Sequence, residues 1–465
     1  MRLKLNKSKM PFSTPLLFTD KDLMKIFIPL IIEQILASLI GLSDSIMAAS
    51  IGESAVSAVS LVEMIMLLLI SLFAALAMGG TVIVGQYLGK KQENQAREAS
   101  NQLVWFAGAA GLVIMIFIYL FKSFILDILF GNITDEVYNY ANTYLLIIGA
   151  SIPFLALYNA GAAIFRTMGN SKLPMKIMLA MNILNIAGNV LFIYGFNMGI
   201  AGIAIPTLIS RIGAAVCILI HLTNPKQILH LNKTVKHKFN SMMIKQIMRI
   251  GVPYGIENGI FYFGRLLILS LVSTFGTAAI AANSVGSTIT SLQALPGMAI
   301  GLGMSIVISR CVGAGDFTQA RYYTKKILGI IFVAQIVSSV VSLALFPSIL
   351  SIYNFSAEAT QWTTEIVWSH AIVMILIWPF GNALPSVFRA AGDAKYPMLV
   401  SMITMFCCRI MFAYILVYLF EMGMFATWIA IYCDWLIKGG LFIWRYLNGK
   451  WTTFQATELN GRKAE

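Results

Sequence analysis

The sequence predicts an all-α polytopic membrane protein with twelve transmembrane helices in two parallel six-helix repeat lobes. Three observations lead to this prediction. The composition is 58% hydrophobic and 11% charged, with a mean hydropathy of +0.80, whereas a soluble domain carries roughly a quarter charged residues. Apolar segments recur along the whole chain, and about 20 such residues are enough for a helix to cross a bilayer. The second half of the chain also repeats landmarks of the first half in the same order.

Twelve apolar segments are long enough to span a membrane. Each is expected to be a helix, because a backbone in lipid must satisfy its hydrogen bonds within the segment. In chain order the predicted spans cover residues 24–48, 56–82, 99–121, 140–163, 174–195, 200–222, 250–274, 280–308, 325–346, 364–387, 397–420 and 424–444. They divide the chain into an N-terminal tail, a first lobe, a basic linker, a second lobe and a C-terminal tail, at residues 1–23, 24–222, 223–249, 250–447 and 448–465.

The two predicted lobes are related by an internal duplication. Pro29 returns as Pro253, 224 residues later, and Glu33 returns as Glu257. Further matches pair Gly52 with Gly276, Gly79 with Gly303, Gly89 with Gly313, and Phe165-Arg166 with Phe388-Arg389. Because six spans return the chain to its starting side, both lobes enter the membrane in the same orientation. The repeats are therefore parallel and related by an axis along the membrane normal, as in some secondary transporters.

The net charge of +13 reflects membrane topology rather than nucleic-acid binding. Of the 33 Lys and Arg residues, 28 lie in or beside the two tails and the loops on one side of the predicted membrane. Cytoplasmic loops of membrane proteins carry such an excess of Lys and Arg. We therefore expect a multi-pass protein of the cell membrane with both termini in the cytoplasm, in contact with the lipid bilayer and not with nucleic acid.

The sequence shows no pattern that predicts a cofactor or an enzyme. The five cysteines are odd in number and lack zinc-ligand spacing, and the four histidines are scattered. The glycines after the second span of each lobe lack the spacing of a phosphate-binding loop. We expect no catalytic residues, no resident metal and no use of ATP, so any transport should draw on an ion gradient.

Pro29 and Pro253 lie at equivalent depths in the first span of each lobe. Proline removes a backbone donor and clashes with the carbonyl four residues earlier, which bends or loosens a helix. Matching interruptions in two repeats point to a moving or binding region, although prolines are also common in membrane helices. We therefore predict helix bending at these two residues.

Several acids within the predicted spans have structural interpretations, because a carboxylate in the membrane needs a partner, a cavity or a proton. Glu33 and Glu257 are repeat mates, each one helical turn after its proline. They either tie helices together in both lobes or serve as secondary coupling acids. Arg409 and Asp434 lie at similar depth in the last two spans, and we expect a structural ion pair there rather than a proton relay.

Asp44 differs from these acids because its repeat mate is Ile268, so it has no counterpart in the second lobe. It lies 15 residues beyond Pro29, on the outer side of the first span. An acid present in one lobe only suits a coupling-ion site, since binding of H⁺ or Na⁺ there can bias that lobe alone. The alternative is an interfacial aspartate that caps the end of the span.

The fifth predicted span carries Asn182, Asn185 and Asn189, which lie on one helical face because they are spaced by three and four residues. Three amides on one stripe should point toward a protein interior rather than lipid. Amide oxygens are suitable hard ligands for a cation such as sodium. Hydrogen bonding between helices is the competing interpretation.

The chain resembles the multidrug and toxic compound extrusion (MATE) family over nearly its whole length. No single motif is decisive, but their order and duplication are fairly specific. The motifs are Pro29 followed by residues 41–47 (GLSDSIM), residues 51–59 (IGESAVSAV) with the echo 275–283 (FGTAAIAAN), residues 85–89 (GQYLG), residues 165–171 (FRTMGNS) with the echo 388–393 (FRAAGD), and residues 199–204 (GIAGIA).

The resemblance implies two six-helix lobes facing a central cavity and an antiporter that works by alternating access. It implies export of amphipathic, often cationic small molecules, driven by entry of H⁺ or Na⁺, and we expect a monomer. The family's cation site in the N-terminal lobe would correspond to Asp44, Asn185, Asn189 and Thr207 here. Members often have an aspartate where this chain has Asn189, so Asp44 would be the only acid at the site.

Three other functions remain possible from the sequence. A related duplicated carrier could flip a lipid-linked precursor, although that class usually needs a basic cavity to bind a pyrophosphate. An exporter of one specific metabolite is equally compatible with the sequence. An intramembrane enzyme is least favoured, because no span carries a metal-binding motif or paired acids.

Overall fold

The computed structural model describes residues 15–457 except 132–133, 232–237, 354 and 455, and these residues form helices without any strand. Its first half contains seven α-helices and one π-helix, η2. These are α1 Asp20–Ile51, α2 Glu53–Gly89, α3 Glu93–Phe130, α4 Asp135–Ala150, α5 Ile152–Thr167, α6 Lys172–Val190, η2 Leu191–Gly195 and α7 Ala201–Leu222.

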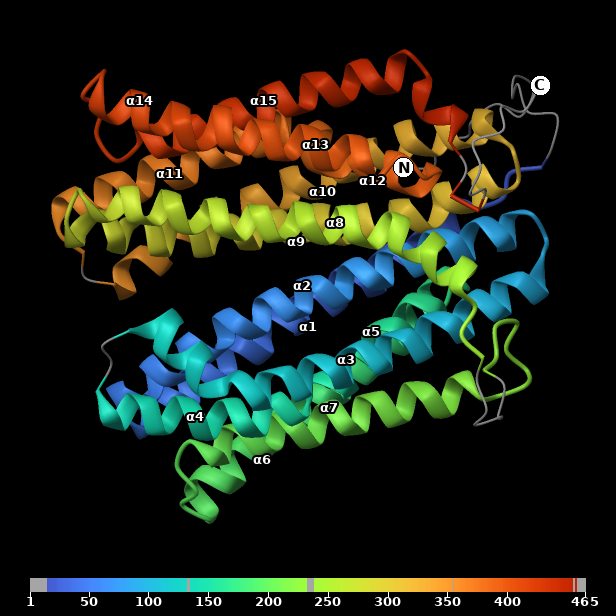
Figure 1. Ribbon diagram of the computed structural model, residues 1–465. Coiled ribbons are helices and arrows are strands. Elements are labelled where there is room, and N and C mark those ends of the chain that lie inside the picture. Colours follow the sequence, from blue (N-terminus) through green and yellow to red (C-terminus); the bar gives the residue numbers. More distant parts are fainter. Residues whose placement is uncertain (1–14, 132–133, 232–237, 354, 455, 458–465) are drawn as a thin grey trace.

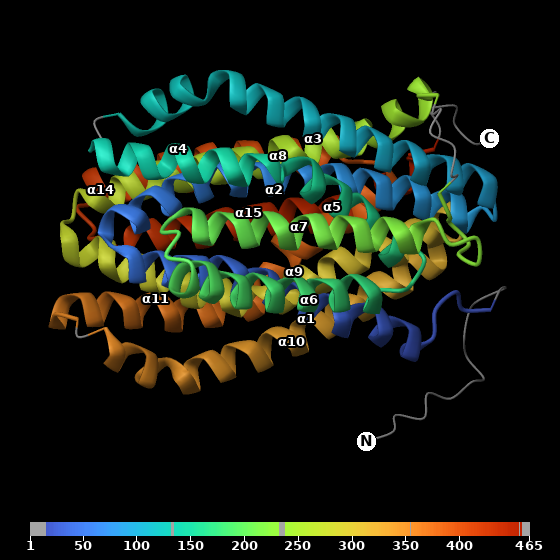
Figure 2. The ribbon, with the colours of Figure 1, turned by 90° about the horizontal axis from the view of Figure 1, so that it is seen from below.

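The second half repeats this order of elements. It contains α8 Ser241–Ser273, α9 Thr277–Gly313, α10 Phe317–Ile352, α11 Ala357–Leu376, η3 Pro379–Ala383, α12 Pro385–Ala391, α13 Lys395–Thr404, η4 Met405–Met411, α14 Phe412–Tyr418, α15 Ala426–Leu447 and the short 3₁₀-helix η5 Lys450–Thr453. Helices α1–α7 lie together on one side of the molecule and α8–α15 on the other, and within each group they run along one common direction (Figure 1, Figure 2). We call the two groups the N-lobe and the C-lobe.

The two lobes confirm the predicted fold class, but two of the spans are broken. Ten helices in the described ranges are long and apolar enough to cross a membrane, and two bent helix pairs bring the number to twelve. The pair α4 and α5 bends by 43°, and α11 bends by 64° against the segment 379–391. Pro153 lies at the start of α5, and Pro379 begins η3. Proline is tolerated in a first helical turn but interrupts a continuing helix.

The first helix of the C-lobe is longer than the sequence predicts. It begins at Ser241, not at residue 250, so the end of the predicted basic linker is helical. Asn240 caps it, because its side-chain oxygen accepts hydrogen bonds from the backbone N–H groups of Met242 and Met243 at 3.1 and 3.3 Å. Hydropathy marks only the part of a helix that lies in lipid, whereas the cap marks where the helix begins.

Close contact between the lobes is concentrated at one end, which we call the inner end, where α2 and α9 terminate. A Cβ atom added to Gly79 of α2 would lie 2.3 Å from the carbonyl oxygen of Ile247 in α8. A Cβ added to Gly313 of α9 would lie 2.1 Å from the carbonyl oxygen of Gln86. Only glycine permits such an approach of two backbones. The lobes converge there and diverge toward the opposite, outer end (Figure 1).

Side chains and terminal segments also connect the lobes at the inner end. The Gln86 amide of α2 donates to the Ala390 carbonyl at 2.8 Å and accepts from the Ala456 backbone N–H at 3.1 Å. The segment before α1 contacts the other lobe, because the Phe18 N–H donates to the Tyr323 hydroxyl at 2.9 Å. The described structure is therefore closed at the inner end.

Substitution of Gly79 by Val is expected to open the inner end while leaving each lobe folded. The new side chain would overlap the Ile247 carbonyl across the lobe interface, so separation of the lobes relieves the clash. We expect a cysteine introduced at the buried Ser309 of α9 to react faster with a maleimide in this variant. Gly329→Val is the matched control, since no atom lies within 4 Å of its added Cβ. Equal labelling in both variants would contradict this role of Gly79.

Candidate functional site

Asp44 is the centre of a buried polar cluster in the N-lobe, and its side chain comes from α1. Only 1% of the residue is exposed. The Asn189 amide of α6 donates to Asp44 Oδ1 at 2.8 Å, and Thr207 Oγ1 of α7 lies 3.3 Å from Asp44 Oδ2. The Asn185 amide donates to Thr207 Oγ1 at 2.7 Å. Three helices thus bring together all four residues that the resemblance assigns to a cation site.

Two carboxamide oxygens of this cluster lack a donor. Asn185 Oδ1 and Asn189 Oδ1 are buried and have no hydrogen-bond partner among the described residues. Buried polar atoms are rarely left unpaired, and a carboxylate with two nearby amide oxygens is a donor set that suits a hard cation. A proton on the Asp44 carboxyl would meet the same need, since a protonated carboxyl can donate to an amide oxygen. The residues therefore fit either H⁺ or Na⁺.

No basic side chain neutralises Asp44 directly. Within the described part of the chain Asp44 makes no ion pair, and the charged side chains that influence it are Glu63 and Arg211. Arg211 instead donates to the Ser151 hydroxyl at 2.8 Å, and Glu63 accepts from the Tyr144 hydroxyl at 3.2 Å. The Asp44 carboxylate is consequently left with hydrogen bonds from neutral groups alone, so a bound cation can replace the missing counter-charge.

Asn182 does not join this cluster, although it lies on the same face of α6. Its amide donates to the Met178 carbonyl of its own helix at 2.9 Å. The face predicted from the spacing is therefore buried as expected, but only its outer two amides reach the Asp44 region. Spacing within one helix cannot show which turn meets the acid of another helix.

The repeat mates Glu33 and Glu257 both bind the arginine of the repeated Phe-Arg motif. Glu33 pairs with Arg166 of α5, whose Nε donates at 3.2 Å to Glu33 Oε2. Glu257 pairs with Arg389 of α12 at 2.9 Å and also accepts from the Ser401 hydroxyl at 2.9 Å. Each acid ties the first helix of its lobe to the broken span. The geometry matches the helix-tying interpretation, and the sequence contained both partners without showing that they meet.

The predicted ion pair between Arg409 and Asp434 is present, with Arg409 Nη2 2.5 Å from Asp434 Oδ2. Both side chains are almost completely buried. The arginine also lies over the ring of Phe261, 5.3 Å from its centroid. A buried acid that is held by an arginine in this way serves to connect η4 with α15.

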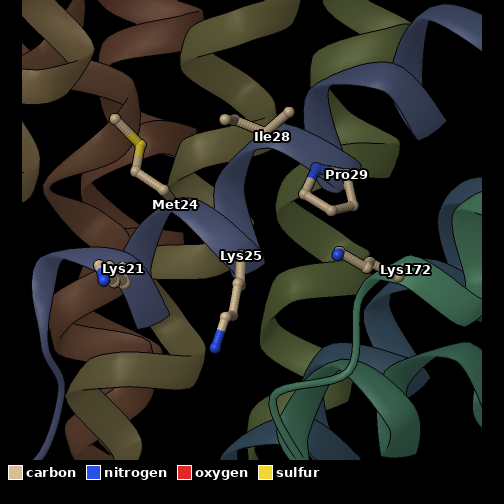
Figure 3. Close-up of a pocket in the computed structure, with 6 residues that line it drawn as sticks. All are labelled: Lys21, Met24, Lys25, Ile28, Pro29 and Lys172. Atoms are coloured by element: carbon tan, nitrogen blue, oxygen red, sulfur yellow. The ribbon is translucent and has the colours of Figure 1, made fainter.

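Pro29 and Pro253 lie inside α1 and α8, which continue through them without a break. Pro29 lines a pocket of about 350 Å³ with Lys21, Met24, Lys25, Ile28 and Lys172 (Figure 3). This pocket belongs to the inner half of α1. Asp44 lies 15 residues further along, or about 22 Å at the helical rise. The pocket is thus separate from the Asp44 cluster, and bending at the prolines stays a prediction.

The described residues contain no group of three or more His, Cys, Asp or Glu side chains that could hold a metal ion. The five cysteines are unpaired, and Cys311 is buried. The candidate site is consequently an array of one carboxylate, two amides and one hydroxyl.

Comparison with known proteins gives consistent matches. The MatE family model matches residues 29–191 and 253–415, one segment in each lobe. The chain is 25% identical to the "Probable multidrug resistance protein YoeA" of Bacillus subtilis, over 93% of this chain and 94% of that protein. It is also 25% identical to the "Probable multidrug resistance protein NorM" of Thermotoga maritima, over 93% of both chains.

Solved structures share the fold. A crystal structure described as "MATE in the bent conformation" superposes with a TM-score of 0.83 at 20% identity, over 92% of this chain and 95% of that one. A structure described as the "outward-facing conformation of a multidrug resistance MATE family transporter" superposes with a TM-score of 0.85 at 20% identity, with the same coverage.

Proposed function

Since the chain belongs to the MATE family of membrane transporters and is not an enzyme, we propose that it is an antiporter that exports positively charged amphipathic compounds in exchange for H⁺ or Na⁺. Its multidrug-resistance relatives support a role in drug efflux. The entering ion binds at Asp44 with Asn185, Asn189 and Thr207. The protein acts as a monomer in the cell membrane, with both termini in the cytoplasm.

One observation carries this proposal: a buried carboxylate without a protein counter-charge lies beside two amide oxygens that have no donor in the described structure. Such a site is stabilised by a cation and destabilised without one, because an unpaired charge within the membrane is costly. Occupancy of Asp44 can therefore change the relative stability of two arrangements of the N-lobe. A ligand shifts an equilibrium only when it binds one state better than the other.

The arrangement of the lobes supports alternating access. Close contacts join the lobes at the inner end, through Gly79 with Ile247 and through Gln86 with Ala390. The described loop after α2, with Lys90 and Lys91, lies at this end, and in our proposal this end faces the cytoplasm according to the positive-inside rule. The described state is then closed to the cytoplasm. In our proposal an ion from outside reaches Asp44 in this state, and bending of α1 near Pro29 accompanies release of substrate.

Transport into proteoliposomes with imposed gradients tests the proposal. We expect a fluorescent lipophilic cation to move against its own gradient when a H⁺ or Na⁺ gradient of opposite direction is imposed. An ionophore selective for the coupling ion should stop this movement, whereas an ionophore for the other ion should not. Absence of movement under both gradients, with protein that is shown to be folded, would contradict the antiport mechanism.

A further inference from the structure

The C-lobe contains a buried charge cluster in which cations outnumber carboxylates. Three basic side chains, Arg389, Arg409 and Lys438, lie near two acids, Glu257 and Asp434. Arg389 is paired with Glu257, and Arg409 is paired with Asp434. Each carboxylate is thus paired with an arginine, although Asp434 Oδ1 has no hydrogen-bond partner in the described structure. Lys438 is the remaining cation, and nothing in the antiport mechanism above uses it.

In the described structure Lys438 donates to a neutral group and forms no ion pair. The residue is 7% exposed, and its Nζ lies 3.3 Å from Asn382 Oδ1. Asp434 precedes it by four residues on the same face of α15, yet no ion pair joins Lys438 to a carboxylate in the described part of the chain. An ammonium group carries three donors, so one amide oxygen leaves most of its binding capacity unused. An ammonium group that is buried among such partners is stabilised by an added anion.

The cluster around Lys438 is not completely enclosed. Asn382 belongs to η3, at the 64° break in the tenth span, and it keeps part of its surface exposed. The Glu257 side chain, part of the same cluster, is 16% exposed. Discontinuous membrane helices often form the substrate sites of transporters.

The Asp44 region of the N-lobe has the opposite charge balance. There two acids, Asp44 and Glu63, lie near one arginine, Arg211. The two lobes therefore differ in sign: one has an excess buried carboxylate, and the other has an excess buried ammonium. A coupling cation neutralises the first. The second requires a ligand of negative charge, which an exporter can receive as part of its substrate.

We propose that Lys438 and Asn382 form a subsite for a carboxylate of the transported compound, so that the exporter prefers zwitterionic amphiphiles to purely cationic ones. This inference rests on the proposed export function and names its substrate class. Lys438 supplies the charge. The exposed edge of Asn382 fixes the direction from which the carboxylate approaches. Arg389 and Arg409 neutralise the two nearby acids, so the charge of Lys438 is left over.

A matched pair of dyes tests the inference: rhodamine B, which carries a free carboxylate and a cationic ring system, and its ethyl ester, which is a cation only. Binding to the full-length protein in lipid nanodiscs is measured by fluorescence polarisation. We expect the wild-type protein to bind the acid about tenfold more tightly than the ester, equivalent to about 1.4 kcal/mol. Lys438→Met should remove this preference by weakening binding of the acid alone. Lys438→Arg keeps the charge and should retain the preference.

Several outcomes would overturn the subsite. The subsite would be ruled out by the wild-type protein alone if it bound the two dyes with equal affinity or bound neither of them. An equal loss of affinity for both dyes in a folded Lys438→Met protein would also rule it out. A preference that disappears when gluconate is replaced by chloride would assign the site to an inorganic anion instead. Failure of the antiport proposal is distinct, since it abolishes ion-driven transport in the proteoliposome experiment but leaves the dye preference intact.

Discussion

Replacement of Asp44 by Asn is expected to reduce ion-driven efflux to the level of vesicles without protein, while the protein stays folded. The substitution keeps the size of the side chain and one oxygen that can accept from Asn189, while an amide NH2 group takes the place of the other oxygen. It removes the negative charge and the titratable proton, and no other carboxylate contacts the Asn189 and Thr207 side chains in the described structure. Without a charge to neutralise, ion binding no longer distinguishes the two states of the transporter.

The measurement is drug accumulation in proteoliposomes under an imposed H⁺ or Na⁺ gradient, together with the unfolding temperature of the purified variant. Glu53→Gln is the matched control, because Glu53 is an exposed acid of the same lobe. It should transport like the wild-type protein. Normal ion-driven efflux by a folded Asp44→Asn protein would rule out Asp44 as the coupling residue.

Glu33→Gln is expected to destabilise the N-lobe by about 3 kcal/mol, because it leaves the Arg166 guanidinium without its carboxylate. Removal of one member of a buried ion pair typically costs about 3–5 kcal/mol. The lower end applies here, since 15% of the Arg166 side chain is exposed whereas Glu33 is almost completely buried. The Tyr158 hydroxyl, 3.3 Å from Glu33 Oε1, also loses a charged acceptor. The unfolding temperature in detergent should fall accordingly.

The double variant Glu33→Gln with Arg166→Met shows whether stability is lost because the Arg166 charge is unpaired or because the side-chain packing has changed. It removes the buried charge that the single variant leaves unpaired, so it should recover much of the lost stability. Glu53→Gln again serves as the exposed control and should unfold at the wild-type temperature. A single variant as stable as the wild-type protein would show that the pair does not tie α1 to α5.

The sequence predicted the lobes and their spans well because lipid imposes a strong and local constraint. A run of apolar residues in a chain with 11% charged residues must be helical and must cross the membrane. The sequence indicated only possible bends in the fourth and tenth spans, with less support than at Pro29 and Pro253. Pro153 and Pro379 marked them, but proline also occurs inside the unbroken helices α1 and α8. Packing against neighbouring helices decides whether a proline interrupts the helix.

The candidate site was predictable in part. The spacing of Asn185 and Asn189 gave a common helical face, and the missing repeat mate of Asp44 singled out that acid. Which residues meet across helices was not evident, because contacts between distant segments leave no periodic signal in the sequence. The Glu33 pair with Arg166 and the contact of Lys438 with Asn382 were found only in the structure.

Ion movement driven by substrate tests the central claim most directly. A substrate gradient is imposed across proteoliposomes in the absence of any ion gradient, and the internal pH and Na⁺ concentration are followed with fluorescent indicators. We expect H⁺ or Na⁺ to move opposite to the substrate in the wild-type protein. We expect no such movement in an Asp44→Asn variant that still binds the substrate. Equal ion movement in both proteins would contradict the assignment of Asp44 as the coupling site.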